Sequence, residues 1–162
     1  GNYYWYGDVS ISSTEDYEFG FYGELAHNWD EIAFNAPHYL IVKSSGNDRN
    51  DDHNGGHYYW DGSSWTWSTS SRDPDGGADG YDCIGNRGIA KNILTVGSVE
   101  DITAGYSQPS DVVIASYSGW EPTDDCRIKP EIVANGQGLF QLPIPETTII
   151  LPSAVLPWQR PR

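Results

Sequence analysis

The sequence predicts an α/β protein built on a parallel sheet. One stretch has apolar side chains at helical spacing, and short apolar runs without polar alternation follow it along the chain. Such runs are typical of strands covered on both faces, and a helix followed by them indicates a parallel sheet. The aromatic content of 14% exceeds that of a disordered acidic chain, so residues 1–140 are expected to fold. A length of 162 residues suits one domain.

The helix is expected over about residues 24–36. The stretch ELAHNWDEIAFNAP carries its apolar side chains on one stripe, and Pro37 ends it. The stripe consists of Leu25, Trp29, Ile32, Ala33 and Ala36. The helix is therefore expected to be amphipathic.

Four apolar runs are expected to form buried strands. The first, HYLIVKSSGN, ends in small residues, as a strand entering a tight turn does. The others are NILTVGSV, DVVIASYS and KPEIVANG, at residues 92–99, 111–118 and 129–136.

A polar insertion, residues 48–91, separates the first two of these strands. Within it, HYYWDGSSWTWS sets two aromatic runs around Asp61-Gly62, which predicts a hairpin. Further on, DPDGGADGYD spaces four aspartates in a glycine-rich loop, namely Asp73, Asp75, Asp79 and Asp82. Such a loop is either a run of solvated turns, in which Asp and Gly dominate, or a Ca²⁺ site. It does not match the EF-hand pattern.

Charge and composition restrict the partners and the location. A net charge of −14 argues against nucleic acids and anionic membranes, because both would be repelled. No apolar run approaches the roughly 20 residues of a membrane-spanning helix. The acidic, Tyr- and Trp-rich composition suggests secretion, and a start without Met predicts a piece of a longer chain. Cys83 and Cys126 could form one bridge or remain thiols.

Gly46-Asn47 follows the first expected strand. Gly and Asn both tolerate positive φ, so a plain turn explains the pair. Ligands of open parallel sheets bind beyond the carboxyl ends of strands, so the Asn47 amide is also well placed to meet a ligand.

Three segments carry a resemblance to a known family. PHYLIVKSSGNDR, GIAKNILTVGSVED and PSDVVIASYSGWEPTDDCRIKPEIVANGQGLF, in this order, resemble subtilisin-like serine peptidases (subtilases), above all the large secreted bacterial ones with long insertions. The resemblance covers roughly residues 23–140. It implies an incomplete three-layer α/β/α catalytic domain acting on peptide or protein substrates. It also implies that Asn47 is the oxyanion-hole donor and that Ser44, Ser45 and Gly46 line the primary specificity pocket.

The resemblance further implies that the catalytic triad is incomplete in this chain. Subtilases supply Asp, His and Ser in that order, with the first two well before the oxyanion asparagine. None of the four histidines has the family's His-Gly-Thr-His context; they are His27, His38, His53 and His57. The isolated chain is therefore expected to be inactive. A different class of function, a noncatalytic carbohydrate- or ligand-binding module, is suggested by the Tyr- and Trp-rich composition.

The tail, residues 141–162, differs from the rest of the chain. It holds five of the ten prolines, but no glycine and no tyrosine. By resemblance, a Gly-Thr-Ser-Met-Ala motif with the nucleophile is expected there, and permitted codons read in another frame yield it. We infer a frameshift soon after Phe140, so the tail is expected not to pack as native structure. Glu121 and Cys126 also depart from the family, which has glycine at both places.

Overall fold

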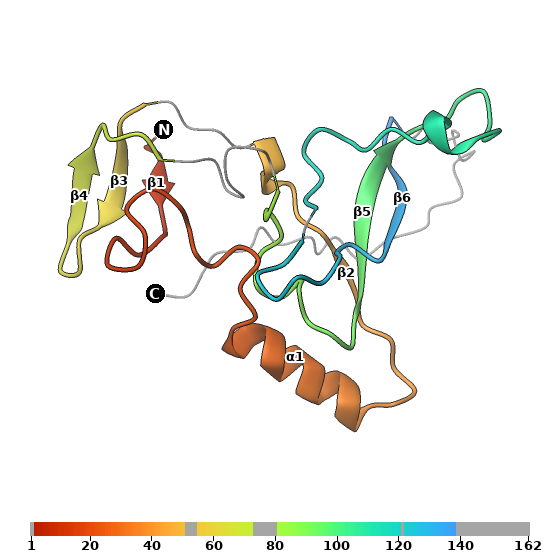
Figure 1. The fold of residues 1–162 in the computed structure, drawn as a ribbon, viewed down its shortest axis with the longest axis horizontal. Helices are drawn as coiled ribbons and strands as arrows, with labels where there is room; N and C mark the ends of the chain where they lie inside the picture. The colour runs from red at the N-terminus through yellow and green to blue at the C-terminus, as the bar shows by residue number, and fades with distance from the viewer. Residues whose placement is uncertain (1, 51–54, 73–80, 121, 139–162) are drawn as a thin grey trace, which may run out of the picture.

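The computed structural model of the chain describes residues 2–50, 55–72, 81–120 and 122–138 (Figure 1). These residues form one helix, six strands and two short 3₁₀ turns. In chain order they are β1 (Tyr4–Trp5), α1 (Glu24–Asn35), β2 (Val42–Ser44), a 3₁₀ turn (Asp48–Asn50), β3 (His57–Trp60), β4 (Trp65–Ser68), β5 (Leu94–Glu100), a 3₁₀ turn (Pro109–Asp111) and β6 (Ile132–Gln137). The predicted α/β class is confirmed.

One of the two sheets is the expected parallel sheet. Its strand order is β2-β5-β6, with Val42 opposite Leu94 and Val96 opposite Ile132. In Figure 1 this sheet lies apart from the second sheet, β1-β3-β4, and α1 lies below both. The long connection from β2 to β5 contains the whole β3-β4 hairpin.

The expected strand over residues 111–118 was wrong. The chain leaves the Pro109–Asp111 turn, makes one antiparallel bridge from Ile114 to Val99, and turns again where the Ser118 amide donates to the Ala115 carbonyl. The apolar run is short because these two turns bound it. Instead, the turn at Ser118 contacts β5 through a hydrogen bond from the Ser98 amide to Ser118 Oγ.

The prediction that the strands are covered on both faces was also wrong. Leu40, just before β2, and Val42 within it are exposed, and every residue of β6 is exposed. In β5 burial alternates: Thr95, Gly97 and Val99 are buried, the residues between them are partly covered, and Glu100 is exposed. Among the described residues, packing therefore covers only one side of the central strand β5. A continuous run of apolar residues is not sufficient to bury a strand on both faces.

Helix α1 matches the expected range, but its inward face overlaps the expected stripe only in part, at Ala33 and Trp29. Its buried residues are Ala26, Asp30 and Ala33, whereas Leu25 and Ile32 are exposed. The reason is the Asp30 carboxylate, which accepts hydrogen bonds from backbone amides outside the helix and so fixes its rotation. An apolar stripe drawn from spacing alone does not include a polar anchor.

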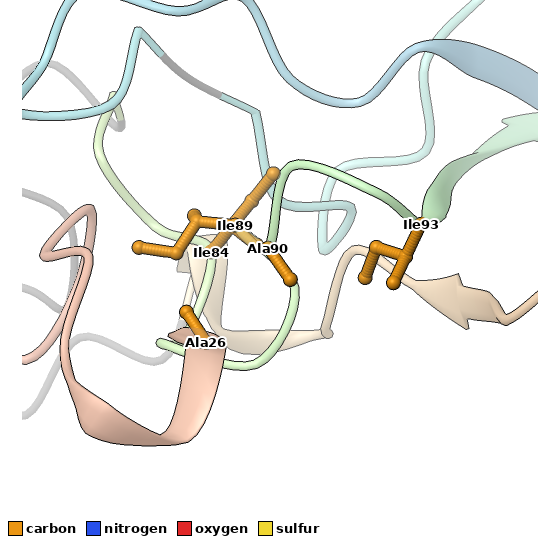
Figure 2. Close-up of a cluster of buried hydrophobic side chains, with 5 residues drawn as sticks. All are labelled: Ala26, Ile84, Ile89, Ala90 and Ile93. Atoms are coloured by element: carbon orange, nitrogen blue, oxygen red, sulfur yellow. The ribbon is translucent and has the colours of Figure 1, made fainter. Parts of the chain in front are cut away.

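The apolar core lies between α1 and the segment that leads into β5 (Figure 2). It consists of Ala26, Ile84, Ile89, Ala90 and Ile93, with Tyr22, Trp29 and Ile41 packed against it. Ile84, Ile89 and Ala90 fall within the range 48–91, so the last part of this range supplies core side chains. This packing attaches the helix to the start of β5.

The predicted hairpin is confirmed as β3 and β4, which pair antiparallel with Tyr58 opposite Trp67. Its turn is organised by Asp61, whose Oδ1 accepts the amides of Ser63 at 2.8 Å and Ser64 at 2.9 Å. Hydrogen bonds from Thr66 and these serines lower the pKa of Asp61 well below its usual value. The sequence did not predict that β1 would pair in parallel with β3 and complete a small sheet.

Candidate functional site

The four site residues inferred from resemblance lie together in the turn at the carboxyl end of β2. Ser44 is the last residue of β2, and the Ser45 amide donates to the Val96 carbonyl at 2.9 Å. Gly46 has a φ of +101°, in the region that favours glycine. The Asn47 side chain follows at once and is exposed. The chain geometry thus presents an amide beyond the end of a parallel strand.

The hydroxyl groups of Ser45 and Ser118 connect this turn to β5. The buried Ser45 Oγ lies 3.2 Å from Ser118 Oγ. Ser118 Oγ in turn accepts the Ser98 amide of β5 at 2.9 Å. The turn that replaced the expected third strand therefore has a role, because it connects the candidate site to the central strand.

Gly119 brings a second segment into backbone contact with the same turn. Its amide donates to the Gly46 carbonyl at 3.5 Å. A Cβ at Gly119 would lie 2.7 Å from the Ser45 carbonyl oxygen and 2.8 Å from that of Cys83. Since both neighbours are backbone atoms, only glycine fits without displacing the turn.

A stack of side chains flanks the turn. The guanidinium of Arg49 lies 3.7 Å from the centroid of the Trp120 ring, and the Tyr81 ring stacks on Trp120 at 5.5 Å. The Trp120 amide donates to Cys83 Sγ at 3.2 Å, and the thiol donates back to the Trp120 carbonyl. No motif in the sequence indicated this stack. The only available indication of the stack was that Arg49 lies two residues after Asn47 in the sequence.

Two opposite charges border the turn, the Lys43 ammonium and the Asp48 carboxylate. Lys43 Nζ donates to the Ser44 carbonyl at 2.9 Å and lies 3.3 Å from Ser44 Oγ. Burial lowers the pKa of Lys43, and the neighbouring Asp48 carboxylate opposes that change. The Asp48 carboxylate lies close to the turn as well, because its Oδ2 would be 2.9 Å from a Cβ at Gly46.

The two cysteines are not bonded to each other. Cys83 is buried against Trp120, whereas Cys126 is exposed. Cys126 has a φ of +63° in a turn closed by its amide and the Thr123 carbonyl at 2.7 Å. This is where the resemblance expects glycine. Glu121, the other departure, lies outside the described residues.

Replacing Cys126 by glycine is expected to stabilise the fold. A side chain in the left-handed region costs about 1–2 kcal/mol, while glycine loses about 0.4–1 kcal/mol through greater freedom in the unfolded chain. We expect Cys126→Gly to raise the free energy of unfolding by roughly 0.5–1 kcal/mol. Urea denaturation in reducing buffer measures it. Cys126→Ala is the matched control, since it keeps the Cβ and should gain nothing; equal gains in both variants would disprove the backbone explanation.

The described histidines lie in the small sheet or on the surface. His57 is buried in the small sheet, where its Nε2 accepts from Arg72 Nε at 2.9 Å and its Nδ1 lies 3.2 Å from the Gly55 carbonyl. His27 and His38 are exposed, and His53 lies outside the described residues. His57 therefore has a structural role in the small sheet.

The calcium hypothesis concerns residues that are mostly outside the described part of the chain. Asp73, Asp75 and Asp79 are not described, and Asp82 is. Among the residues that the structure describes, no group of three or more His, Cys, Asp or Glu side chains could hold a metal ion. The Ca²⁺ site stays a prediction. The inferred frameshift product, residues 141–162, also lies outside the described residues.

Comparison with known proteins gives one match. A model of the family described as the Subtilase family matches residues 9–155. No curated protein and no solved structure matches the chain.

Proposed function

Because the chain belongs to the subtilase family, a family of serine-type peptidases, we propose that it is part of the catalytic domain of a secreted serine endopeptidase. The reaction is acyl transfer from a peptide bond, and its substrates are peptides and proteins. One observation carries the assignment of residues: the Asn47 amide stands exposed beyond a strand of a parallel sheet, on a turn fixed by Ser118 and Gly119.

Asn47 is proposed as the donor that stabilises the oxyanion. Attack on a peptide carbonyl places negative charge on its oxygen, and a preorganised N–H stabilises that charge more than it stabilises the ground state. The neighbouring residues support such preorganisation of Asn47. The Gly46 carbonyl accepts a hydrogen bond from the Gly119 amide, and the Arg49 guanidinium lies against the Trp120 ring. The Lys43 ammonium favours an anion near the turn, and the Asp48 carboxylate beside Gly46 opposes it.

Ser44, Ser45 and Gly46 are proposed to line the pocket for the substrate side chain. All three are small, so they leave space beside the strand. The Ser45 hydroxyl points to Ser118, and we therefore expect Ser45 to contribute through its backbone. Calcium bound by Asp73, Asp75, Asp79 and Asp82 remains part of the proposal as a stabilising ion, with no step of the reaction assigned to it.

The isolated chain is expected to be inactive. It carries the oxyanion donor, but no motif of a catalytic Asp, His or Ser is present in its sequence. We expect no hydrolysis of a fluorogenic peptide or of casein, and no labelling by a fluorophosphonate probe, which reacts with activated serines. Hydrolysis that the probe abolishes would overturn both the inactivity and the incomplete triad. Active subtilisin treated in the same way serves as the positive control.

A carbohydrate-binding module is the other class of function considered. Exposed coplanar aromatic rings would favour it, since sugars stack on flat platforms. On the exposed face of the small sheet Tyr4 and Tyr58 are near parallel, at 23°, but Trp65 meets Tyr4 at 89° and Tyr6 at 80°. We therefore retain the peptidase as the proposed function.

None of the helices that the structure describes is long and apolar enough to span a membrane.

A further inference from the structure

A cavity of about 330 Å³ is lined by residues of the small sheet and of the segments that follow β1 and β4. Its lining is rich in hydroxyl groups and contains one guanidinium; it includes Ser13, Thr14, Ser68, Ser70, Ser71 and Arg72. Val9 and Tyr59 supply the rest of the wall, and no carboxylate of the described residues lines it. The volume lies at the lower end of the range for small-molecule sites. The cavity therefore suits a small ligand that carries hydrogen-bond acceptors.

Arg72 is held in one orientation at this cavity. Its Nε donates to His57 Nε2 at 2.9 Å, and its Nη1 donates to the Ser13 carbonyl. The guanidinium lies 4.0 Å from the centroid of the Trp5 ring and 4.9 Å from that of Tyr59. Neither of these two hydrogen bonds uses Nη2, so one end of the guanidinium keeps its donors for a ligand.

Within the part of the chain that the structure describes, no carboxylate neutralises the charge of Arg72. The ion pairs found there involve Lys91, Arg127 and Lys129. The two acceptors that Arg72 contacts, the His57 ring nitrogen and the Ser13 carbonyl, are uncharged. Burial lowers the pKa of Arg72, because the guanidinium has lost part of its contact with water. A partly buried charge without a counter-ion is costly, so an anionic ligand would stabilise this arrangement.

We propose that the cavity binds a carboxylate, carried by an amino-acid derivative or by the last residue of a peptide. One guanidinium matches the single charge of a carboxylate, whereas a phosphate carries close to two charges and is repelled more strongly by a chain of net charge −14. Arg72 Nη2 can donate to the carboxylate, and so can the hydroxyl groups of Ser70 and Ser71. The Ser70 amide donates to Ser68 Oγ at 3.1 Å, which fixes the segment ahead of Arg72. This proposal is independent of the peptidase assignment.

Binding of N-acetylphenylalanine to the whole chain tests the proposal, with its uncharged amide as the matched ligand. NMR of the chain labelled with nitrogen-15 arginine follows the Arg72 Nε–H signal, which Arg72→Lys identifies by its disappearance. We expect this signal to shift saturably with N-acetylphenylalanine and to stay in place with N-acetylphenylalaninamide. Inorganic phosphate at equal ionic strength should bind more weakly than the carboxylate.

A charge placed on the cavity wall gives the matching test on the protein. Ser71→Glu should weaken binding of N-acetylphenylalanine about tenfold, because the new carboxylate competes for the guanidinium. Ser71→Gln has the same size without the charge and should weaken it much less. Ser71 is exposed, so both variants should keep the fold. Thr103→Glu adds the same charge at an exposed position outside the cavity and should leave binding nearly unchanged.

The outcomes separate the alternatives. Near-ultraviolet circular dichroism of the Trp60–Trp65 pair shows whether each variant keeps the small sheet. Weaker binding in Ser71→Glu with the sheet intact, and not in Ser71→Gln or Thr103→Glu, supports the proposal. Absence of binding to the unaltered chain, or equal binding of the amide, overturns it. Tighter binding of phosphate overturns the assignment to a carboxylate, and an equal loss in Thr103→Glu would mean that net charge alone governs binding, which overturns the site.

Discussion

Removing the Asn47 side chain should abolish most of the catalytic rate in an enzyme that carries this turn. The expected loss is about 100- to 1000-fold in kcat, or about 2.7–4 kcal/mol, with little change in KM. Subtilisin is the source of these magnitudes for the loss of one oxyanion donor. The donor acts on charge that exists only in the transition state, so the effect belongs in kcat.

The measurement uses a catalytically complete subtilase into which residues 37–49 have been transplanted. Asn47→Ala is compared with Asn47→Asp, which keeps the shape but replaces the donor by a negative charge and should lose more. His38→Ala is the control, since His38 is exposed within the same segment. A loss below tenfold, or one confined to KM, would show that Asn47 is only a turn residue.

The sequence predicted those parts of the molecule in which local pattern and tertiary structure agree. Pro37 and the spacing of apolar residues gave the helix, and Asp61-Gly62 between aromatic runs gave the hairpin. The turn at Asn47 was identified by the chemistry of Gly46 after an apolar run, and the positive φ of Gly46 agrees with it. In each case the determining residues are neighbours in sequence.

What the sequence did not predict depends on contacts between distant residues. Asp30 turns α1 by bonding to amides about sixty residues later, and a hydrophobic stripe does not show this. Ser118 and Gly119 support the Asn47 turn from a segment that resembled a strand. Pairing of β1 with β3 joins the N-terminal stretch to the hairpin. No local periodicity encodes such pairings.

Asp30 is expected to be the side chain whose loss most destabilises the described core. Its carboxylate accepts the Tyr22 hydroxyl at 2.6 Å, the Lys91 amide at 2.9 Å and the Asn92 amide at 2.6 Å. It is buried, and it connects α1 to the segment before β5. Asp30→Ala leaves two backbone N–H groups without their acceptor, at about 1–3 kcal/mol each. We expect a loss of about 3 kcal/mol in the free energy of unfolding, measured by urea denaturation.

The free energy of unfolding lost in Asp30→Ala should become smaller as the pH falls. Burial alone would raise the pKa of Asp30, but hydrogen bonds from Tyr22 and the amides of Lys91 and Asn92 lower it below the ordinary value of 3.8. A carboxyl group whose pKa is lower in the folded state stabilises the fold fully above its unfolded pKa. That contribution disappears as the pH falls through the folded pKa. The difference between the unaltered chain and Asp30→Ala should therefore be constant near neutrality and shrink below about pH 4.

Tyr22→Phe separates the hydroxyl contact from the two amide contacts. It removes one donor and leaves both backbone amides satisfied, so its cost should be about 1.5 kcal/mol, roughly half that of Asp30→Ala. The hydrogen bond to Asp30 also raises the pKa of Tyr22 to about 12, chiefly by favouring the protonated phenol. In Asp30→Ala this pKa should fall toward 10.0, which NMR titration of labelled tyrosine follows. An unchanged Tyr22 pKa together with a pH-independent stability loss would mean that Asp30 acts by filling space and not as an anionic acceptor.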